Sequence, residues 1–258
     1  MTPPALRPLS VGEILDVSFT LYRRHFASLA VVALVCSGIP VLLNMYIAAS
    51  GGMLQNLSLL PVYYVVLVAL NSIATAATVF IVSDSYLGRP INAGTALRRA
   101  APLIVRILIC SMLTALVVGV GFVLLVIPGI ILIAGLILSI PALVIEGKSA
   151  SAALSRSWEL SRGSRWRILG LLLVLVVLLY VPVAAIGAIA AIFLPGASTM
   201  ILTTGDTTAT VIAVAIGGLI QIFVYPLFYC VLTVAYYDLR VRKEGFDLEV
   251  LAATLQVA

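Results

Sequence analysis

Long runs without a charged residue alternate with short charged segments along this chain. Residues 26–83 and 107–145 carry no charge, and residues 168–237 carry only Asp206. A helix that crosses a membrane needs about 20 mostly apolar residues. Each of the three runs is therefore long enough for two membrane spans.

Turn signals divide each run in two. Ser50-Gly51-Gly52 interrupts the first run, and Pro61 then stands where proline suits the first turn of a helix. Pro128-Gly129 interrupts the second run, and the polar loop 203–208 interrupts the third. The fourth span is short, so we expect it to be little tilted or to thin the bilayer locally. The pattern predicts spans at about 27–49, 61–83, 105–127, 130–145, 168–193 and 210–236.

Amphipathic segments precede the first, third and fifth spans. Ser10 and Glu13 form a capping box, and residues 10–25 then place apolar side chains on one face. This spacing predicts an interfacial helix in the headgroup region. Residues 149–163 predict a second such helix that ends at Gly163, and a shorter one covers residues 96–101.

The order of these segments predicts an internal repeat. Gly88-Arg89 and Gly147-Lys148 each lead through a short polar helix to an Arg-Ile-Leu triplet, at residues 106–108 and 167–169. The N-terminal helix and its two spans make a third, more diverged unit. We therefore expect an all-α integral membrane protein with six transmembrane helices, built from three parallel hairpin units that each follow a cytoplasmic amphipathic surface helix.

The composition excludes the soluble classes. Of 258 residues, 63% are hydrophobic and 10% are charged, and the mean hydropathy is +1.23. A soluble domain is nearer 45–50% apolar and about 25% charged. The three cysteines all fall in apolar runs without a CxxC pair, which favours buried thiols over disulfides. No cleavable signal is evident, so we expect the N-terminus to be retained.

The predicted spans place nearly all charged residues on one side of the membrane. All 15 Lys and Arg and nine of the ten acids fall before span one, between spans two and three, between four and five, or after six; Asp206 is the exception. This bias predicts a multi-pass protein with both termini cytoplasmic. The last helix is expected to run on to Glu244 and end at Gly245, within a cytoplasmic tail over 238–258. The net charge of +5 then favours anionic lipid headgroups, not nucleic acid.

The residue inventory argues against an enzyme. His25 is the only histidine, so neither an HExxH zinc site nor a histidine cluster can form. The chain contains neither a GxxxxGK[ST] loop nor a GxGxxG motif, so nucleotide phosphates have no evident cradle. We expect no catalytic residue, no metal and no cofactor.

Polar residues inside the spans leave a transporter or permease for a small solute or lipid open as an alternative. Asn71 and Gln221 lie near the centres of spans two and six. They could line a path, although hydrogen bonds between packed helices explain them equally well. Prolines inside the spans can kink helices and expose carbonyl groups: Pro40, Pro141, Pro182 and Pro226.

Three blocks carry a family resemblance. They are RPLSVGEILD with LYRRHF (7–16 and 21–26), EGK with ALSRSWEL (146–148 and 153–160), and YYDLRVRKEGFDL (236–248). In this order they resemble the bacterial family named for the membrane domain of glycerophosphoryl diester phosphodiesterase. The resemblance implies a stand-alone, multi-pass protein of the bacterial inner membrane. Family members that give the name carry a phosphodiesterase barrel. Since the chain ends soon after the last block and lacks a histidine-rich metal site, we do not expect that activity here.

The combined interpretation is a non-catalytic membrane module that binds lipid headgroups or a partner protein at its cytoplasmic face. In this hypothesis the acids tie the surface helices together and the arginines meet lipid phosphate, unless all of them only form ion pairs that fix the helices. A membrane-embedded lipid-modifying enzyme, with Asp84, Glu146 and Asp238 clustered, stays a further alternative. The sequence does not indicate an oligomeric state. The candidate face residues are Glu13, Asp16, Arg23, Glu146, Arg156, Trp158, Asp238, Arg240 and Arg242.

Overall fold

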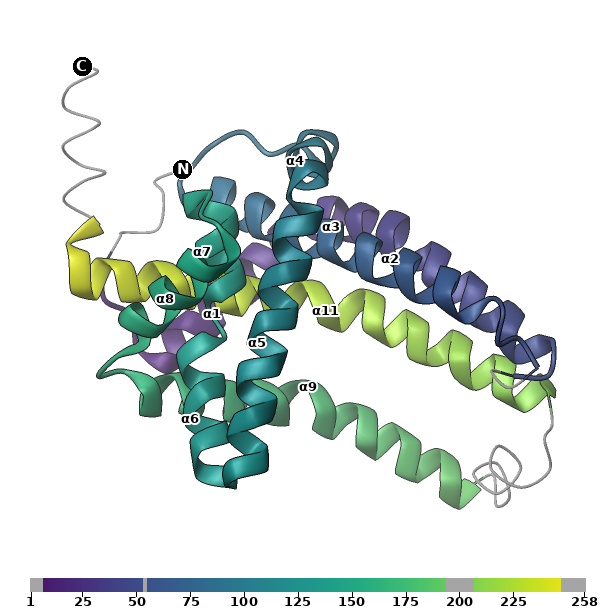
Figure 1. Cartoon of the computed structure of the whole chain (residues 1–258). Helices are drawn as coiled ribbons and strands as arrows, with labels where there is room; N and C mark the ends of the chain where they lie inside the picture. Colours follow the sequence, from purple (N-terminus) through teal and green to yellow (C-terminus); the bar gives the residue numbers. More distant parts are fainter. Residues whose placement is uncertain (1–6, 53–54, 194–206, 247–258) are drawn as a thin grey trace.

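The computed structural model describes residues 7–52, 55–193 and 207–246, and every regular element in these ranges is a helix (Figure 1). Asp206 and most of the predicted tail lie outside the described residues. A one-turn 3-10 helix, Ala101–Leu103, joins α4 to α5. The α-helices are α1 (Val11–Arg24), α2 (Phe26–Ala49), α3 (Leu60–Tyr86), α4 (Ala93–Ala100), α5 (Ile104–Leu124), α6 (Val126–Leu136), α7 (Ser139–Glu146), α8 (Ala150–Ser161), α9 (Arg165–Phe193) and α11 (Thr207–Glu244).

Within the described residues, five helices are long and apolar enough to cross a membrane. A sixth is added if α8 and the first part of α9, bent by 100° at the break between them, count as one span. This all-helical architecture is that of a multi-pass membrane protein. The five are Phe26–Ala49, Leu60–Tyr86, Ala93–Leu124, Val126–Glu146 and Thr210–Glu244.

Several predicted helix ends agree with the structure. Ser10 and Glu13 form both hydrogen bonds of the capping box at the start of α1. Gly51 and Gly52 have positive φ angles in the turn after α2, and Pro61 lies in the first turn of α3. The last helix continues to Glu244 and is followed by Gly245 at φ +64°, as the sequence predicts.

The turn between α5 and α6 does not lie where the sequence predicts it. The extended residue is Leu125, with φ −166° and ψ 154°, and α6 already begins at Val126. Pro128 falls in the first turn of α6, where its missing N–H costs no helical hydrogen bond. The predicted Pro128-Gly129 turn is therefore wrong. The fourth apolar segment is also broken after Leu136 into α6 and α7.

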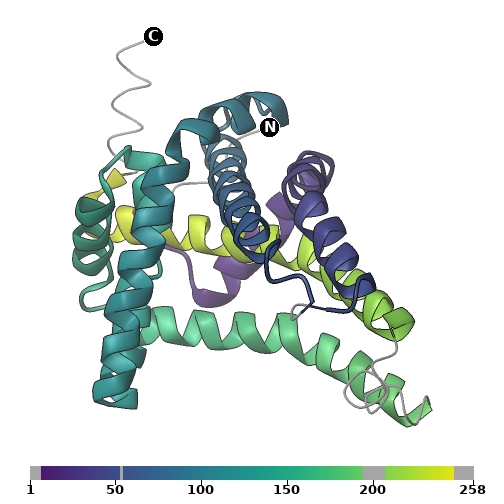
Figure 2. The ribbon, with the colours of Figure 1, turned by 45° about the vertical axis from the view of Figure 1, so that its right-hand side comes forward.

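The helices do not all run in one direction. α11 packs along α2 and α3. The hairpin of α5 and α6 instead runs across the direction of α9 and α11, as the two views in Figure 1 and Figure 2 agree in showing. The prediction of three hairpins side by side is thus not confirmed, although α1, α4 and α8 each precede two of the apolar helices in the chain.

The best-packed part of the molecule is one end of the α3–α11 pair. Every residue of 74–83 in α3 and of 229–239 in α11 is buried. By contrast, α2, α5 and α9 expose large apolar side chains such as Leu42, Leu116 and Leu173. In a membrane protein these faces suit contact with lipid chains. The buried end of α3 and α11 is the one that carries their charged residues.

Candidate functional site

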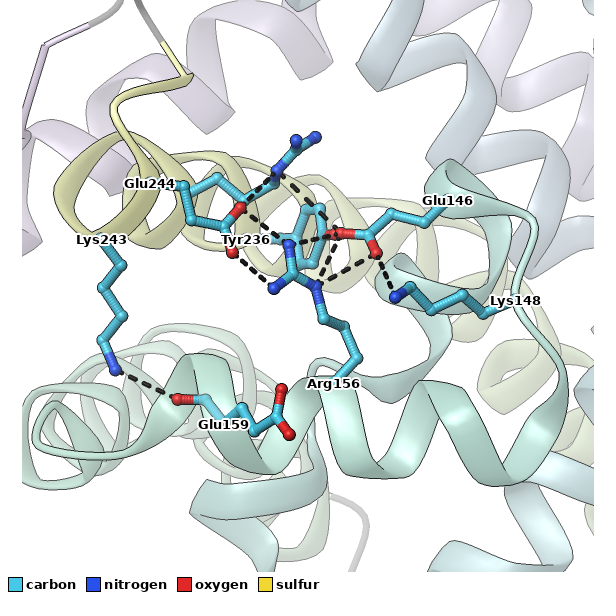
Figure 3. A network of polar contacts seen from close by, with 8 residues as sticks. Glu146, Lys148, Arg156, Glu159, Tyr236, Lys243 and Glu244 are labelled. Atoms are coloured by element: carbon cyan, nitrogen blue, oxygen red, sulfur yellow. Dashed lines mark hydrogen bonds and ion pairs between the residues drawn. The ribbon is translucent and has the colours of Figure 1, made fainter.

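A cluster that we call the Arg156 network joins three helices at this charged end (Figure 3). α7 ends at Glu146, and Gly147 in the left-handed conformation turns the chain back into α8. Arg156 on α8 therefore returns to Glu146, and its Nε lies 2.9 and 3.1 Å from the two carboxylate oxygens. The Arg156 side chain is 19% exposed.

The other half of the Arg156 network comes from α11. Arg156 Nη2 donates to Glu244 at 2.7 Å, and Arg240 Nε, one turn before Glu244, donates to the same carboxylate at 3.2 Å. The Tyr236 hydroxyl donates to Glu146. Arg156 thus lies between two carboxylates from different helices, so the network fastens α7 and α8 to α11.

Two lysines complete this region. Lys148 Nζ lies 3.2 Å from the Glu146 carboxylate. Lys243 on α11 donates to the backbone carbonyls of Glu159 and Arg162 at the end of α8, the first of them at 3.2 Å. A cation there satisfies carbonyl groups that a helix C-terminus leaves without a partner. The α8 helix is therefore held to α11 at two separate points.

A second cluster, the Asp238 network, fixes the segment that precedes α1. Asp238 on α11 is 1% exposed, and it accepts hydrogen bonds from the Leu9 backbone N–H at 2.7 Å, from Arg167 Nη1 at 2.6 Å and from Arg242 Nε at 3.1 Å. The carbonyl of Leu9 in turn accepts from both Arg167 and Arg242, the latter at 2.6 Å. One buried carboxylate and two arginines thus hold both polar backbone groups of Leu9, which ties the N-terminal segment to α9 and α11.

Asp84 belongs to neither of these clusters. Asp84 at the end of α3 pairs with Arg99 of α4 at 2.9 Å, and the Arg99 guanidinium lies 4.0 Å from the centre of the Phe80 ring. Asp84, Glu146 and Asp238 each have their own arginine partner. Among the described residues, no group of three His, Cys, Asp or Glu side chains is placed to hold a metal ion. The arrangement required for a metal-dependent lipid enzyme is not found in the part of the chain that the structure describes.

Trp158 packs into the helices and does not stand alone at the surface. A Cβ added at Gly135 of α6 would lie 2.4 Å from the Trp158 ring, so this glycine admits the indole. On the other side the Arg165 guanidinium lies 3.7 Å from the ring centre, a cation–π contact. Trp166, next in the chain, is 86% exposed. Of the two tryptophans, Trp166 is therefore the one exposed to lipid or water.

Five of the nine predicted face residues belong to the two networks. Glu146, Arg156 and Arg240 share the Arg156 network, while Asp238 and Arg242 share the Asp238 network. The other four do not join these networks. Glu13 bonds to Ser10 and Arg7 at the start of α1, and Trp158 packs against Gly135 and Arg165. Asp16 and Arg23 are exposed without an ion pair to a described residue.

Six exposed arginines have no carboxylate partner among the described residues. These side chains make no ion pair with any acid in residues 7–52, 55–193 and 207–246, and all six are exposed. They lie at the end of α1, just after α3, in α4, in the first turn of α5 and just after α8. Because the described acids are engaged with other cations or lie elsewhere, this excess positive charge is available to an external anion. The six are Arg23, Arg24, Arg89, Arg98, Arg106 and Arg162.

Asn71 and Gln221 lie far from the charged end, at a cavity between α2, α3 and α11. The cavity has a volume of about 330 Å³, and Asn44 of α2 also lines it. Asn71 donates from Nδ2 to the Leu67 carbonyl at 2.9 Å, within its own helix. The structure therefore brings the two intramembrane polar residues to one space, but it does not join them by a hydrogen bond.

Comparison with known proteins decides the family. Residues 104–252, more than half of the chain, match the family model described as the membrane domain of glycerophosphoryl diester phosphodiesterase. The chain belongs to this family. The resemblance inferred from the three sequence blocks is thereby confirmed. No curated protein and no solved structure matched the chain.

The family match covers the parts of both networks that lie on α7, α8, α9 and α11. It is a match to the membrane domain alone and includes no catalytic domain. Leu9 and helices α1 to α3 precede the matched residues, so the Asp238 network connects the matched and unmatched parts of this family member.

Sequence reasoning missed four participants in the networks: the Leu9 backbone, Arg167, Tyr236 and Glu244. Two of them carried a usable signal. Arg167 occupies the same place as Arg106 in the repeated Arg-Ile-Leu triplet, and Glu244 follows Arg240 at the i, i+4 spacing of a helical ion pair. Leu9 could not be found because a backbone contact leaves no trace in side-chain type.

Proposed function

We propose that this family member is a non-catalytic membrane module that binds anionic lipid headgroups at its charged end. We call this end, which carries the two networks and the six exposed arginines, the charged face. The observation that supports the proposal is the set of six exposed arginines without a carboxylate partner among the described residues. A Lys or Arg near an anionic bilayer surface contributes about 1 kcal/mol to attraction. Several such residues on one face make lipid phosphate the nearest anion of matching charge.

In this proposal the paired and unpaired arginines have different tasks. Arg156, Arg167 and Arg242 are occupied by carboxylates and backbone carbonyls, so they fix helix positions. The unpaired arginines beside them contact phosphate. Exposed Trp166 serves as an anchor at the level of the headgroups, where the amphipathic indole ring is favoured.

The same proposal places α1, α4 and α8 at the membrane surface as the starts of three units, with both termini on the cytoplasmic side of an inner membrane. The one-sided distribution of Lys and Arg supports this orientation. Asp206→Cys should react with an impermeant thiol reagent added from outside intact cells, and Ser151→Cys on α8 should not. Reaction of Ser151→Cys and protection of Asp206→Cys would reverse the orientation.

Lipid binding is tested by native mass spectrometry of the full chain released from nanodiscs that contain phosphatidylglycerol and phosphatidylcholine. Wild type is expected to retain phosphatidylglycerol preferentially. Arg98→Gln/Arg106→Gln should reduce that retention about fivefold or more, since two attractive charges are lost. The matched control Arg98→Lys/Arg106→Lys keeps the charges and should retain the lipid. Equal retention of both lipids by wild type, or a stoichiometric protein in place of lipid, would contradict the proposal.

A further inference from the structure

The cavity between α2, α3 and α11 lies in the half of the bundle remote from the charged face. Its lining comes from residues 37–44, 63–71 and 214–221. At a rise of 1.5 Å per residue, Gln221 is roughly 25 Å along α11 from Asp238. The volume of about 330 Å³ falls in the range of ligand sites, about 300–1,000 Å³.

The lining is rich in polar groups without partners. The side chains of Ser37, Asn44, Tyr63 and Gln221 form no hydrogen bond with any described residue, and Asn71 Oδ1 is buried without one. Pro40 in α2 also lacks the N–H that would bond to the Cys36 carbonyl. At the depth of membrane spans, an unpaired polar group costs free energy because hydrocarbon offers no hydrogen bond.

Toward the charged face, the packing of the same helices is closed and two pairs of hydroxyl groups lie within hydrogen-bond distance, although the Tyr86 hydroxyl is buried without a partner among the described residues. Thr75 of α3 and Tyr225 of α11 lie 3.3 Å apart, and Ser83 and Tyr237 lie 2.6 Å apart. Residues 74–83 between these contacts are all buried. Access to the cavity is therefore from the remote side or laterally past exposed Gln221.

We propose that this cavity is a binding site for a small uncharged polar molecule that enters from the side opposite the charged face. No charged side chain lines it, so an ion would be left uncompensated. Three amide groups and two hydroxyls offer both donors and acceptors, which suits a polyol or an amide. This goes beyond the proposed lipid site, since it concerns other residues at the opposite end of the helices.

Gly217 offers a place for a reporter. It lines the cavity, and a Cβ added there meets no atom within 4 Å. Gly217→Cys in the full chain, reconstituted into vesicles, is treated with an impermeant methanethiosulfonate reagent from either side. Ser151→Cys on α8 reports the side of the charged face. The parent chain, whose Cys36, Cys110 and Cys230 are buried, gives the background.

We expect Gly217→Cys to react from the side opposite to Ser151→Cys, and erythritol or acetamide at millimolar concentration to slow that reaction. Asn44→Leu should weaken this protection about fivefold or more, since the bound molecule loses one hydrogen-bond partner. The same variant should unfold no more readily than the parent, because the Asn44 amide forms no hydrogen bond with any described residue.

Three results would overturn the proposal. Gly217→Cys could fail to react from either side, which would mean that lipid chains fill the space. It could react from the side of the charged face, which would place the opening wrongly. It could react at a rate that neither erythritol nor acetamide changes, which would mean that water alone occupies the cavity. None of these results bears on lipid retention by the arginines, so the two proposals can fail separately.

Discussion

The charged face and the remote cavity lie at opposite ends of the same helices. They differ in how many of their polar side chains have a hydrogen-bond or ion-pair partner. At the charged face, Asp238 accepts three donors and Arg156 lies between two carboxylates. At the cavity, Asn71 Oδ1 has no partner and the nearby amides of Asn44 and Gln221 have none within the described residues. Buried polar groups in proteins are normally satisfied. Among the described residues the buried exceptions are Asn71 Oδ1 at the cavity, and the Tyr86 hydroxyl and Arg165 Nε nearer the charged face. The cavity differs because its exception adjoins further polar side chains without partners.

Polar groups with partners fix the positions of the helices, whereas polar groups without partners can bind a ligand. A satisfied network stabilises the helix positions, and breaking it leaves a partly buried charge without its partner. An unsatisfied group lowers stability in the empty protein and is retained where it serves a ligand. The first kind is expected at the networks, and the second at the cavity and among the unpaired arginines.

The largest expected effect is the removal of the Asp238 carboxylate. Asp238→Ala leaves Arg167, Arg242 and the Leu9 N–H without their acceptor. Loss of one partner of a buried pair costs about 3 kcal/mol of the free energy of unfolding. The measurement is equilibrium unfolding in mixed micelles, with exposed and unpaired Asp16→Ala as the matched control. Equal effects of the two variants would show that the Asp238 network holds nothing.

The Arg156 network should show coupling between distant parts of the chain. Arg156→Leu breaks the ion pairs with Glu146 and Glu244, and Glu244→Leu breaks those with Arg156 and Arg240. Because both variants lose the Arg156–Glu244 pair, the double variant should be less destabilised than the sum of the two by about 1–2 kcal/mol. A double-mutant cycle of unfolding free energies measures this term. Arg162→Leu, which removes an exposed and unpaired arginine, should change stability by no more than about 0.5 kcal/mol. Strict additivity of the pair would count against the contact.

Substitution of one glycine at each end compares the close packing of the charged end with the open space at the cavity. Gly135→Ala at the charged end would place a methyl group 2.4 Å from the Trp158 ring and should cost about 2 kcal/mol of unfolding free energy. Gly217→Ala at the cavity meets open space and should gain about 0.5–1 kcal/mol, because alanine favours a helix over glycine. Opposite signs in the same unfolding assay are the expected result, and a loss at both positions would mean that the cavity is already filled.

Local signals made the helix ends predictable, whereas contacts between distant residues were not. Ser10 with Glu13, and Gly245 after Glu244, depend on neighbours in the chain, and both agree with the structure. Arg156 and Glu244 are 88 residues apart, and no periodicity in either helix reports that they meet.

The turn before α6 and the direction of the α5–α6 hairpin show a second limit. Pro128 suits both a turn and the first turn of a helix, so its presence alone could not place the break at Leu125. The direction of the hairpin across α9 and α11 depends on packing against α8 and α9, which a hydrophobic run does not encode. The cavity was likewise visible only as two polar residues, Asn71 and Gln221, without the helix positions that bring them together.

The smallest expected effect is the pH response of the first turn of α1. The Ser10 backbone N–H, at 2.6 Å, and the Arg7 guanidinium lower the pKa of Glu13 to about 2 from a usual value near 4.5. Because the pKa is lower in the folded chain, the capping contribution is complete above about pH 4.5 and is lost as the pH falls toward 2. The protection of the amides of residues 11–14 against hydrogen exchange, taken as a ratio to that in Glu13→Gln, should fall toward one over this range. Asp16→Asn, which removes an acid outside the capping box, should leave the response unchanged, and a flat ratio in the parent would exclude the box as its source.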